Sequence, residues 1–130
     1  MSTDSQAERL PSLRTIAMPA DANPSGDIFG GWIMSQMDLA GAIYASYAVK
    51  GRLVTVGVES MTFHKPVLIG DQVSCYCQTT RIGRTSISIH IETWVRRKHS
   101  NQENSKVTEA TYTYVSINES RQPIPIELIT

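Results

Sequence analysis

The sequence predicts an α+β fold in which one long helix packs on one face of an antiparallel sheet. One helical pattern occurs early in the chain, and four later segments alternate polar and apolar residues with a period of two. No helical pattern separates these later segments, so they are expected to form antiparallel strands. Isoleucine, valine and threonine are frequent, and such β-branched residues favour sheet over helix.

The first elements follow in a simple order. Residues 1–12 are polar and are expected to form a flexible N-terminal arm, followed by a short strand at 13–18. Residues 19–31 contain several prolines and glycines, which predicts an irregular loop. From 32 to about 49, apolar residues recur every three or four positions; this spacing predicts the helix, and Gly51 ends it.

The second half of the chain is predicted to be sheet. Alternation marks four strands, near residues 54–59, 73–78, 86–92 and 110–114. Turns are expected at 70–71, at 81–84 and across 99–105. Two prolines predict an extended, loose C-terminal tail at 121–130, so a single domain is expected over 13–120.

Composition excludes some classes of function. The 130 residues suit one domain, and 12 basic residues balance 12 acidic ones. A net charge of zero gives no support to general nucleic-acid binding or to polybasic membrane adhesion. Charged residues make up 18%, below the roughly 25% usual for soluble domains, which suggests that another subunit covers part of the surface. No targeting or membrane-spanning segment is recognisable, so a soluble cytoplasmic protein is expected.

The two cysteines, Cys75 and Cys77, lie two apart on a predicted strand and point the same way. They are too close in sequence for an ordinary disulfide. No accompanying cysteine or histidine has metal-ligand spacing, so no metal site is predicted. We expect buried thiols in a reducing compartment.

Asp38 is the residue that stands out. It is the only charged residue between Gly30 and Val49, and its neighbours three and four positions away include no cation. A carboxylate buried without a partner is costly, and such residues cluster at functional sites. Alternatively, Asp38 faces solvent at a helix end or pairs with an arginine from a distant strand.

Two further features suggest anion binding. Gly30 and Gly31 at the helix start offer unpaired N–H groups for an anion or a developing oxyanion, although a glycine pair also suits a tight turn. The turn at 81–86 places arginines and hydroxyls around a glycine, and these groups can bind phosphate. Alternatively, it is an ordinary basic hairpin turn. Other cations expected near this turn are Lys65, Arg96, Arg97 and Lys98.

Several chemistries lack their motifs. The chain has no Gly-x-Ser-x-Gly elbow, no Walker loop and no dinucleotide glycine fingerprint. Its three histidines show no metal-ligand spacing, and none lies in the 19–31 loop, where a histidine would support dehydratase chemistry.

Longer blocks of sequence carry a resemblance to a known family. Residues 13–23 and 26–38 closely resemble the hotdog-fold acyl-CoA thioesterases of the YciA type, and similarity extends over roughly 13–117. The later supporting pieces are residues 51–56, 61–63, 66–67, 70–71 and 108–110.

This resemblance implies the hotdog fold, a long helix wrapped by a curved antiparallel sheet. It implies hydrolysis of acyl-CoA to a free acid and coenzyme A, with no cofactor, at sites on the interface of dimers that join edge to edge and commonly assemble as a trimer of dimers. Asp38 resembles the catalytic carboxylate, acting as general base or as nucleophile. Asn23 resembles the polar partner from the opposing protomer, and Gly30 and Gly31 resemble the turn whose amide polarises the thioester carbonyl.

Contacts to the coenzyme A phosphates are expected from the turn after the predicted second long strand and, more weakly, from Lys65. The turn residues concerned are Arg81, Gly83, Arg84, Thr85 and Ser86. Two alternatives remain: a non-catalytic acyl-CoA sensor on the same scaffold, and a hotdog enoyl-CoA hydratase.

Overall fold

The computed structural model describes residues 9–101, 103 and 105–130. Most of the predicted N-terminal arm, residues 1–8, lies outside this range. The elements in chain order are β1 (Leu13–Ile16), the short 3-10 helix η2 (Pro19–Asp21), α1 (Gly30–Ser46), β2 (Arg52–Phe63), β3 (Gln72–Ile82), β4 (Ser86–Arg96) and β5 (Ser105–Ile117). None of the described helices is long and apolar enough to cross a membrane.

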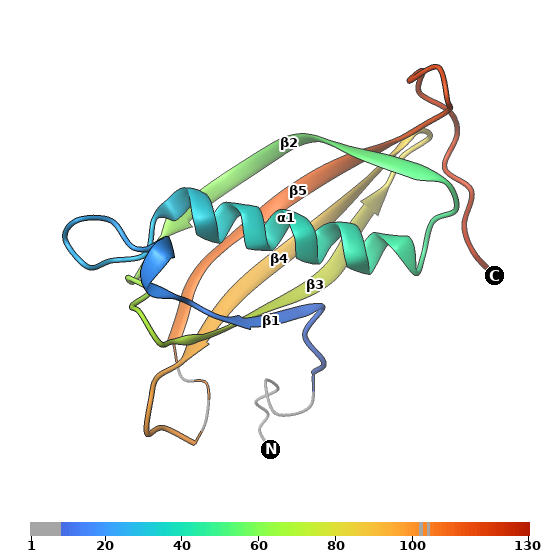
Figure 1. The fold of residues 1–130 in the computed structure, drawn as a ribbon. Helices are drawn as coiled ribbons and strands as arrows, with labels where there is room; N and C mark the ends of the chain where they lie inside the picture. Colours follow the sequence, from blue (N-terminus) through green and yellow to red (C-terminus); the bar gives the residue numbers. More distant parts are fainter. Residues whose placement is uncertain (1–8, 102, 104) are drawn as a thin grey trace.

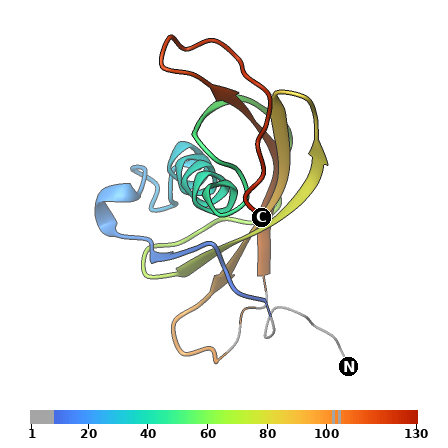
Figure 2. The ribbon, with the colours of Figure 1, turned by 90° about the vertical axis from the view of Figure 1, so that its right-hand side faces the viewer.

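The five strands form one antiparallel sheet in the order β1-β3-β4-β5-β2. The sheet curls around α1, which lies against its concave face (Figures 1 and 2). The predicted fold class is therefore confirmed, with strands several residues longer than the alternating segments that predicted them.

The helix begins at Gly30, two residues before the predicted start, and its last helical residue is Ser46. The ring of Phe63 packs against Gly30. A Cβ atom added to Gly30 would lie 3.3 Å from Cζ of Phe63. At the other end a turn follows, and Gly51 adopts a φ of 84°, a left-handed conformation that suits glycine and turns the chain into β2.

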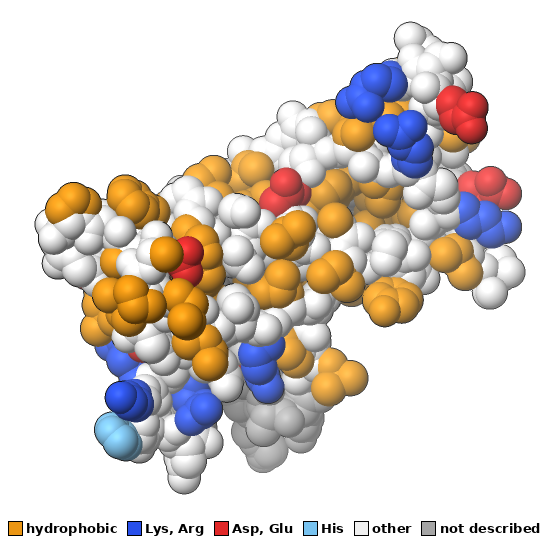
Figure 3. All heavy atoms as spheres, in the orientation of Figure 1, with side chains coloured by type: hydrophobic (Ala, Val, Ile, Leu, Met, Phe, Trp, Pro, Cys, Tyr) orange, Lys and Arg blue, Asp and Glu red, His pale blue; other side chains and the backbone are white. Residues whose placement is uncertain are grey.

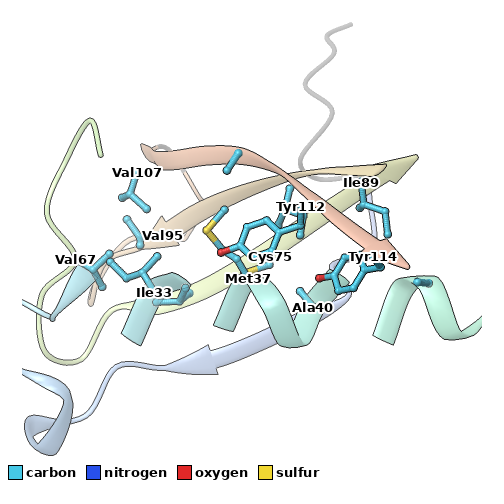
Figure 4. Packing of buried hydrophobic residues seen from close by; sticks show 14 of the residues in the cluster. Ile33, Met37, Ala40, Val67, Cys75, Ile89, Val95, Val107, Tyr112 and Tyr114 are labelled. Carbon is cyan, nitrogen blue, oxygen red and sulfur yellow. The ribbon is translucent and has the colours of Figure 1, made fainter. Parts of the chain in front are cut away.

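The core lies between α1 and the sheet (Figure 4). Buried helix residues recur about once per turn on the sheet-facing side: Ile33, Met37, the adjacent pair Ala40 and Gly41, and Ala45. They meet alternate residues of β4 and β5, among them Ile89, Ile91, Tyr112 and Tyr114, all at most 1% exposed. Each large side chain buried here contributes about 1.5–3 kcal/mol of transfer free energy.

A β-bulge in β2 changes which of its side chains face the helix. Strict alternation would place Val54, Val56 and Val58 together on one face. Instead the register shifts between Thr55 and Gly57, so Thr55 pairs with Tyr114 and Val58 with Tyr112. Both pairs belong to the helix side of the sheet, because Tyr112 and Tyr114 point there (Figure 4).

The C-terminal tail is extended, but hydrogen bonds hold it in place. Its residues Ile126 and Ile129 donate backbone N–H groups to Arg84 and Ala48 at 2.7 and 2.9 Å. Leu128 forms an isolated bridge with Val49, so the tail joins the end of α1 to the β3–β4 hairpin.

The two edges of the sheet differ. β1 has four residues, whereas β2 has twelve and pairs only on its β5 side. A long unpaired edge strand is a template for another chain. Val56 on this edge is 58% exposed, and three apolar side chains on the outer side of α1 are 38–51% exposed: Met34, Leu39 and Ile43. Hydrophobic side chains gather over this face in Figure 3.

Candidate active site

Asp38 lies at the middle of α1, and two hydroxyl groups hold its carboxylate. Thr55 Oγ1 donates to Oδ1 at 2.7 Å, and the Tyr114 hydroxyl donates to the same oxygen at 3.1 Å. Within the described residues, no cationic side chain lies within 4 Å of this carboxylate. Asp38 is half-buried. Its place in the middle of α1 excludes a position at a helix end, and within the described residues no arginine pairs with it.

The tyrosines below Asp38 are protonated donors. Burial, with a further contribution from the negative charge of Asp38, holds the pKa of the Tyr114 hydroxyl far above its usual value. The same two causes raise the pKa of Tyr112, whose hydroxyl donates to the Met34 carbonyl oxygen at 2.8 Å. Asp38 therefore receives hydrogen bonds without being neutralised by a positive charge.

The loop before α1 forms a second polar region. The side-chain oxygen of Asn23 accepts backbone N–H groups from Ser25 and Asp27, at 2.9 and 3.1 Å, which closes this loop. Asn23, Gly30 and Lys65 line one pocket of about 410 Å³. Its other lining residues are Asp27, Ile28, Ile33, Phe63, His64, Pro66 and Val67.

Gly31 lies at the exposed start of the helix. Its N–H has no acceptor among the residues that the structure describes, and an added Cβ would meet open space. The amide is thus free to donate to an oxyanion, as the sequence predicts for a helix N-terminus.

A single chain does not bring Asp38 together with the start of its own helix. Seven residues separate Gly31 from Asp38, a rise of about 10 Å along the axis. One thioester carbonyl with its attacking water is too small to touch both groups.

The turn at 81–86 lies at the other end of the molecule. It closes the β3–β4 hairpin beside the C-terminal tail, opposite the loop that carries Asn23 (Figure 1). The Gly83 N–H donates to the Ser86 carbonyl oxygen at 2.8 Å, and the Arg84 and Thr85 carbonyls accept N–H groups from neighbouring segments. Arg81 and Arg84 are exposed, and within the described chain no carboxylate lies within 4 Å of either.

The expectation that other cations lie near this turn is wrong. β4 runs away from Ser86 for eleven residues, about 33 Å, so Arg96 to Lys98 lie at its far end. There Arg97 pairs with Asp71, with 2.9 Å between Nε and Oδ1. Lys65 also lies at that end, in the connection that begins beside the Asn23 pocket.

One cluster has the donor atoms for a metal ion. His90, Glu92 and Glu109 place three possible ligand atoms within 4.8 Å of one another on β4 and β5. Both carboxylates already have cationic partners. The hydrogen bond from Lys106 lowers the pKa of Glu109; burial would raise that of Glu92, but hydrogen bonds from Trp94 and Arg9 lower it. The cluster is thus neutralised by the protein's own side chains.

Sequence reasoning missed the two residues that hold the Asp38 carboxylate, Thr55 and Tyr114. Alternation placed Tyr114 on a strand face that is expected to be buried, and a buried tyrosine hydroxyl needs a partner. Nothing in the sequence shows that this partner is Asp38, 76 residues away.

Comparisons with known proteins agree with this architecture. Residues 25–99 match the family described as the thioesterase superfamily. The chain is 53% identical over 116 residues to the acyl-CoA thioester hydrolase YciA of Salmonella typhimurium, covering 88% of this chain and 87% of that protein.

Solved structures give the same picture. A hexameric thioesterase from Yersinia pestis superposes with a TM-score of 0.84 at 49% identity, over 92% of this chain and 97% of that one. A hexameric hotdog fold thioesterase of Campylobacter jejuni gives 0.82 at 44% identity, over 90% of both chains. With α1 wrapped by a curved five-stranded sheet, the chain belongs to the thioesterase superfamily of hotdog-fold proteins.

Proposed function

We propose that this protein hydrolyses acyl-CoA thioesters to a free carboxylic acid and coenzyme A. The observation that carries the proposal is the carboxylate of Asp38, which is held by hydroxyl groups, lacks a cation among the described residues and lies midway along an apolar helix. The 53% identity to a named acyl-CoA thioester hydrolase supports the substrate class.

The chemistry needs a base and an oxyanion donor. A water oxygen attacks the thioester carbonyl carbon while Asp38 takes its proton, and the carbonyl oxygen becomes an oxyanion that accepts the Gly31 N–H. The intermediate then expels the coenzyme A thiolate, which takes the proton that Asp38 removed from water and becomes the thiol. In the alternative route, the Asp38 carboxylate attacks the carbonyl carbon and expels the coenzyme A thiolate, forming a mixed anhydride. Water then hydrolyses this anhydride to the free acid and restores the Asp38 carboxyl group, and the thiolate takes a proton from that water.

A second copy of the chain completes this site in our proposal. The 10 Å rise between Gly31 and Asp38 argues that the two act in one site only when they come from different protomers. The open β2 edge and the exposed apolar side of α1 fit a twofold partner, because both would be covered by the same contact. Asn23 and Gly31 then belong to one protomer and Asp38 to the other. The hexameric relatives support a trimer of such dimers.

Cations at both ends of the sheet are the proposed contacts for the nucleotide part of coenzyme A. Lys65 lines the Asn23 pocket, and Arg81 and Arg84 flank the exposed hairpin turn with Gly83, Thr85 and Ser86. Because β4 separates the turn at 81–86 from the end of β2 that precedes Lys65, one phosphate cannot contact both groups within a protomer. Coenzyme A is part of the substrate here, and the proposed reaction uses no resident cofactor.

The test is thiol release from a panel of short to long acyl-CoAs, with wild type and Asp38→Asn measured side by side. We expect turnover by wild type and its loss in the variant. Tight acyl-CoA binding without turnover would instead indicate a sensor. Loss of the enoyl absorbance with a 2-enoyl-CoA would indicate a hydratase.

A further inference from the structure

The two hydroxyl groups around Asp38 divide its carboxylate into two unlike oxygens. Thr55 and Tyr114 both donate to Oδ1. Within the described residues, no donor reaches Oδ2. One oxygen is therefore anchored to the sheet, and the other is left for a substrate or a water molecule.

Tyr114 reaches this position from below the helix. Its side chain is 1% exposed and points from β5 toward α1 (Figure 4). The single hydroxyl proton is shared in a three-centre hydrogen bond between Oδ1, 3.1 Å away, and the main-chain carbonyl oxygen of Asp38, 3.0 Å away. A single buried group thus contacts both the backbone and the side chain of Asp38, which fixes the carboxylate relative to the helix.

Gly41 makes the space for this hydroxyl. It lies three residues after Asp38, and an added Cβ would overlap the Tyr114 hydroxyl oxygen and lie 2.9 Å from Tyr114 Cζ and Ile91 Cδ1. Glycine inside a helix is less favourable than alanine, so its presence there calls for a packing reason. Contact with the Tyr114 hydroxyl supplies that reason.

Tyr112 provides an internal comparison. It lies on the same strand and face, its side chain is also 1% exposed, and its hydroxyl donates to the Met34 carbonyl oxygen at 2.8 Å. This hydroxyl bonds a helix carbonyl but no carboxylate. The two tyrosines therefore share burial and packing and differ in the contact with Asp38.

We propose that Tyr114, admitted by Gly41, is a positioning residue for thioester hydrolysis: its hydroxyl holds Oδ1 of Asp38 and so aims Oδ2 at the reacting centre. This inference rests on the proposed function of Asp38. Preorganisation of this kind matters because a small misplacement of a catalytic group costs much of the rate.

The test compares Tyr114→Phe with Tyr112→Phe. Each removes one buried hydroxyl and keeps the ring, so loss of packing is matched. For Tyr114→Phe we expect kcat to fall about tenfold to a hundredfold with KM unchanged, because one orienting hydrogen bond is lost. Tyr112→Phe is expected to keep kcat within about twofold of wild type, since it spares the carboxylate.

The outcomes separate this inference from the proposed function. If wild type is active, Asp38→Asn is inactive and Tyr114→Phe matches Tyr112→Phe in both kcat and KM, the positioning role is wrong while the proposed function holds. If wild type does not turn over acyl-CoA, both are wrong.

A stability cycle tests the geometry without using activity. Gly41→Ala should lower the unfolding midpoint, and adding Tyr114→Phe should recover part of that loss because the clashing oxygen is gone. Additive losses would contradict the role assigned to Gly41.

Discussion

Two aspartates of this protein are held in opposite ways. Asp71 is 2% exposed, and the Arg97 guanidinium donates to both of its carboxylate oxygens at 2.9 and 3.0 Å. The backbone N–H of Leu68 adds a third hydrogen bond at 2.9 Å. Asp38, by contrast, receives hydrogen bonds only from uncharged hydroxyls within the described residues, and one of its oxygens is left without a donor.

The difference fits a structural role for Asp71 and the reactive role that we propose for Asp38. Asp71 is neutralised by a cation and fixes the turn before β3, so its charge is not available for chemistry. Asp38 is oriented but not neutralised, so it keeps the ability to take a proton or to attack a carbonyl. The two carboxylates also differ in burial, but the kind of partner, a cation or an uncharged hydroxyl, decides whether the negative charge is neutralised.

The largest expected effect comes from replacing each of the two aspartates by asparagine. Asp38→Asn should lower kcat by about 10²–10⁴-fold with the fold intact, because the base or nucleophile is lost. Asp71→Asn should keep turnover but lower the free energy of unfolding by about 2 kcal/mol, because charge-assisted hydrogen bonds are lost. Thiol release and urea denaturation of both variants measure this. The opposite pattern, with Asp71→Asn inactive and well folded, would contradict the assignment.

The next prediction asks whether a second protomer completes the Asp38 site. Asn23→Ala and Asp38→Ala chains should each be nearly inactive. After subunit exchange, random pairing should restore about one quarter of wild-type activity, because half of the dimers then contain one intact site. Mixed samples are assayed before and after mild dissociation and reassembly, with mass spectrometry as the control for exchange. Proven exchange without recovery would count against a shared site.

A smaller effect extends the comparison to cations. Arg97 is occupied by Asp71, whereas neither Lys65 nor Arg84 has a carboxylate within 4 Å in the described chain. Lys65→Ala and Arg84→Ala should therefore raise KM for acyl-CoA several-fold, with kcat nearly unchanged, since they remove phosphate contacts and not reacting groups. Lys98→Ala, an exposed cation, is the control. A normal KM in both variants would exclude them as coenzyme A contacts.

The effect that is smallest at neutral pH concerns the two thiols, which are both protonated there. Burial raises the pKa of the Cys75 thiol to about 12 and that of Cys77 to about 11. In the unfolded chain these thiols ionise at lower pH, so the unfolded state binds fewer protons above about pH 9. Stability should fall from about pH 9 toward pH 11, by up to about 1.4 kcal/mol per pH unit for each thiol.

Denaturant midpoints across this pH range measure the thiol effect, and Cys75→Ala should flatten the decline. Alkylating reagents should label neither native thiol at pH 8, because the thiolate is the reactive form. Rapid labelling of the native protein would contradict it.

The sequence alone was sufficient for the local parts of this structure. The helix around Asp38 and the period-two strands follow from side-chain spacing, because a helix and a strand bury residues at different intervals along the chain. The isolation of Asp38 was also visible, since its helical neighbours are fixed by sequence position. The partners of a group on its own helix can be read directly from the chain.

Only the tertiary structure decided what surrounds Asp38. Strand order places β2, the first long strand, beside β5, the last, and a bulge at Val56 turns Thr55 toward the helix. Tyr114 reaches Asp38 because Gly41 leaves room between α1 and β5. These contacts depend on strand pairing and register between segments 17 and 76 residues away from Asp38. Local periodicity does not show which strands pair. A one-residue shift in the pairing register moves every side chain of a strand to the other face of the sheet.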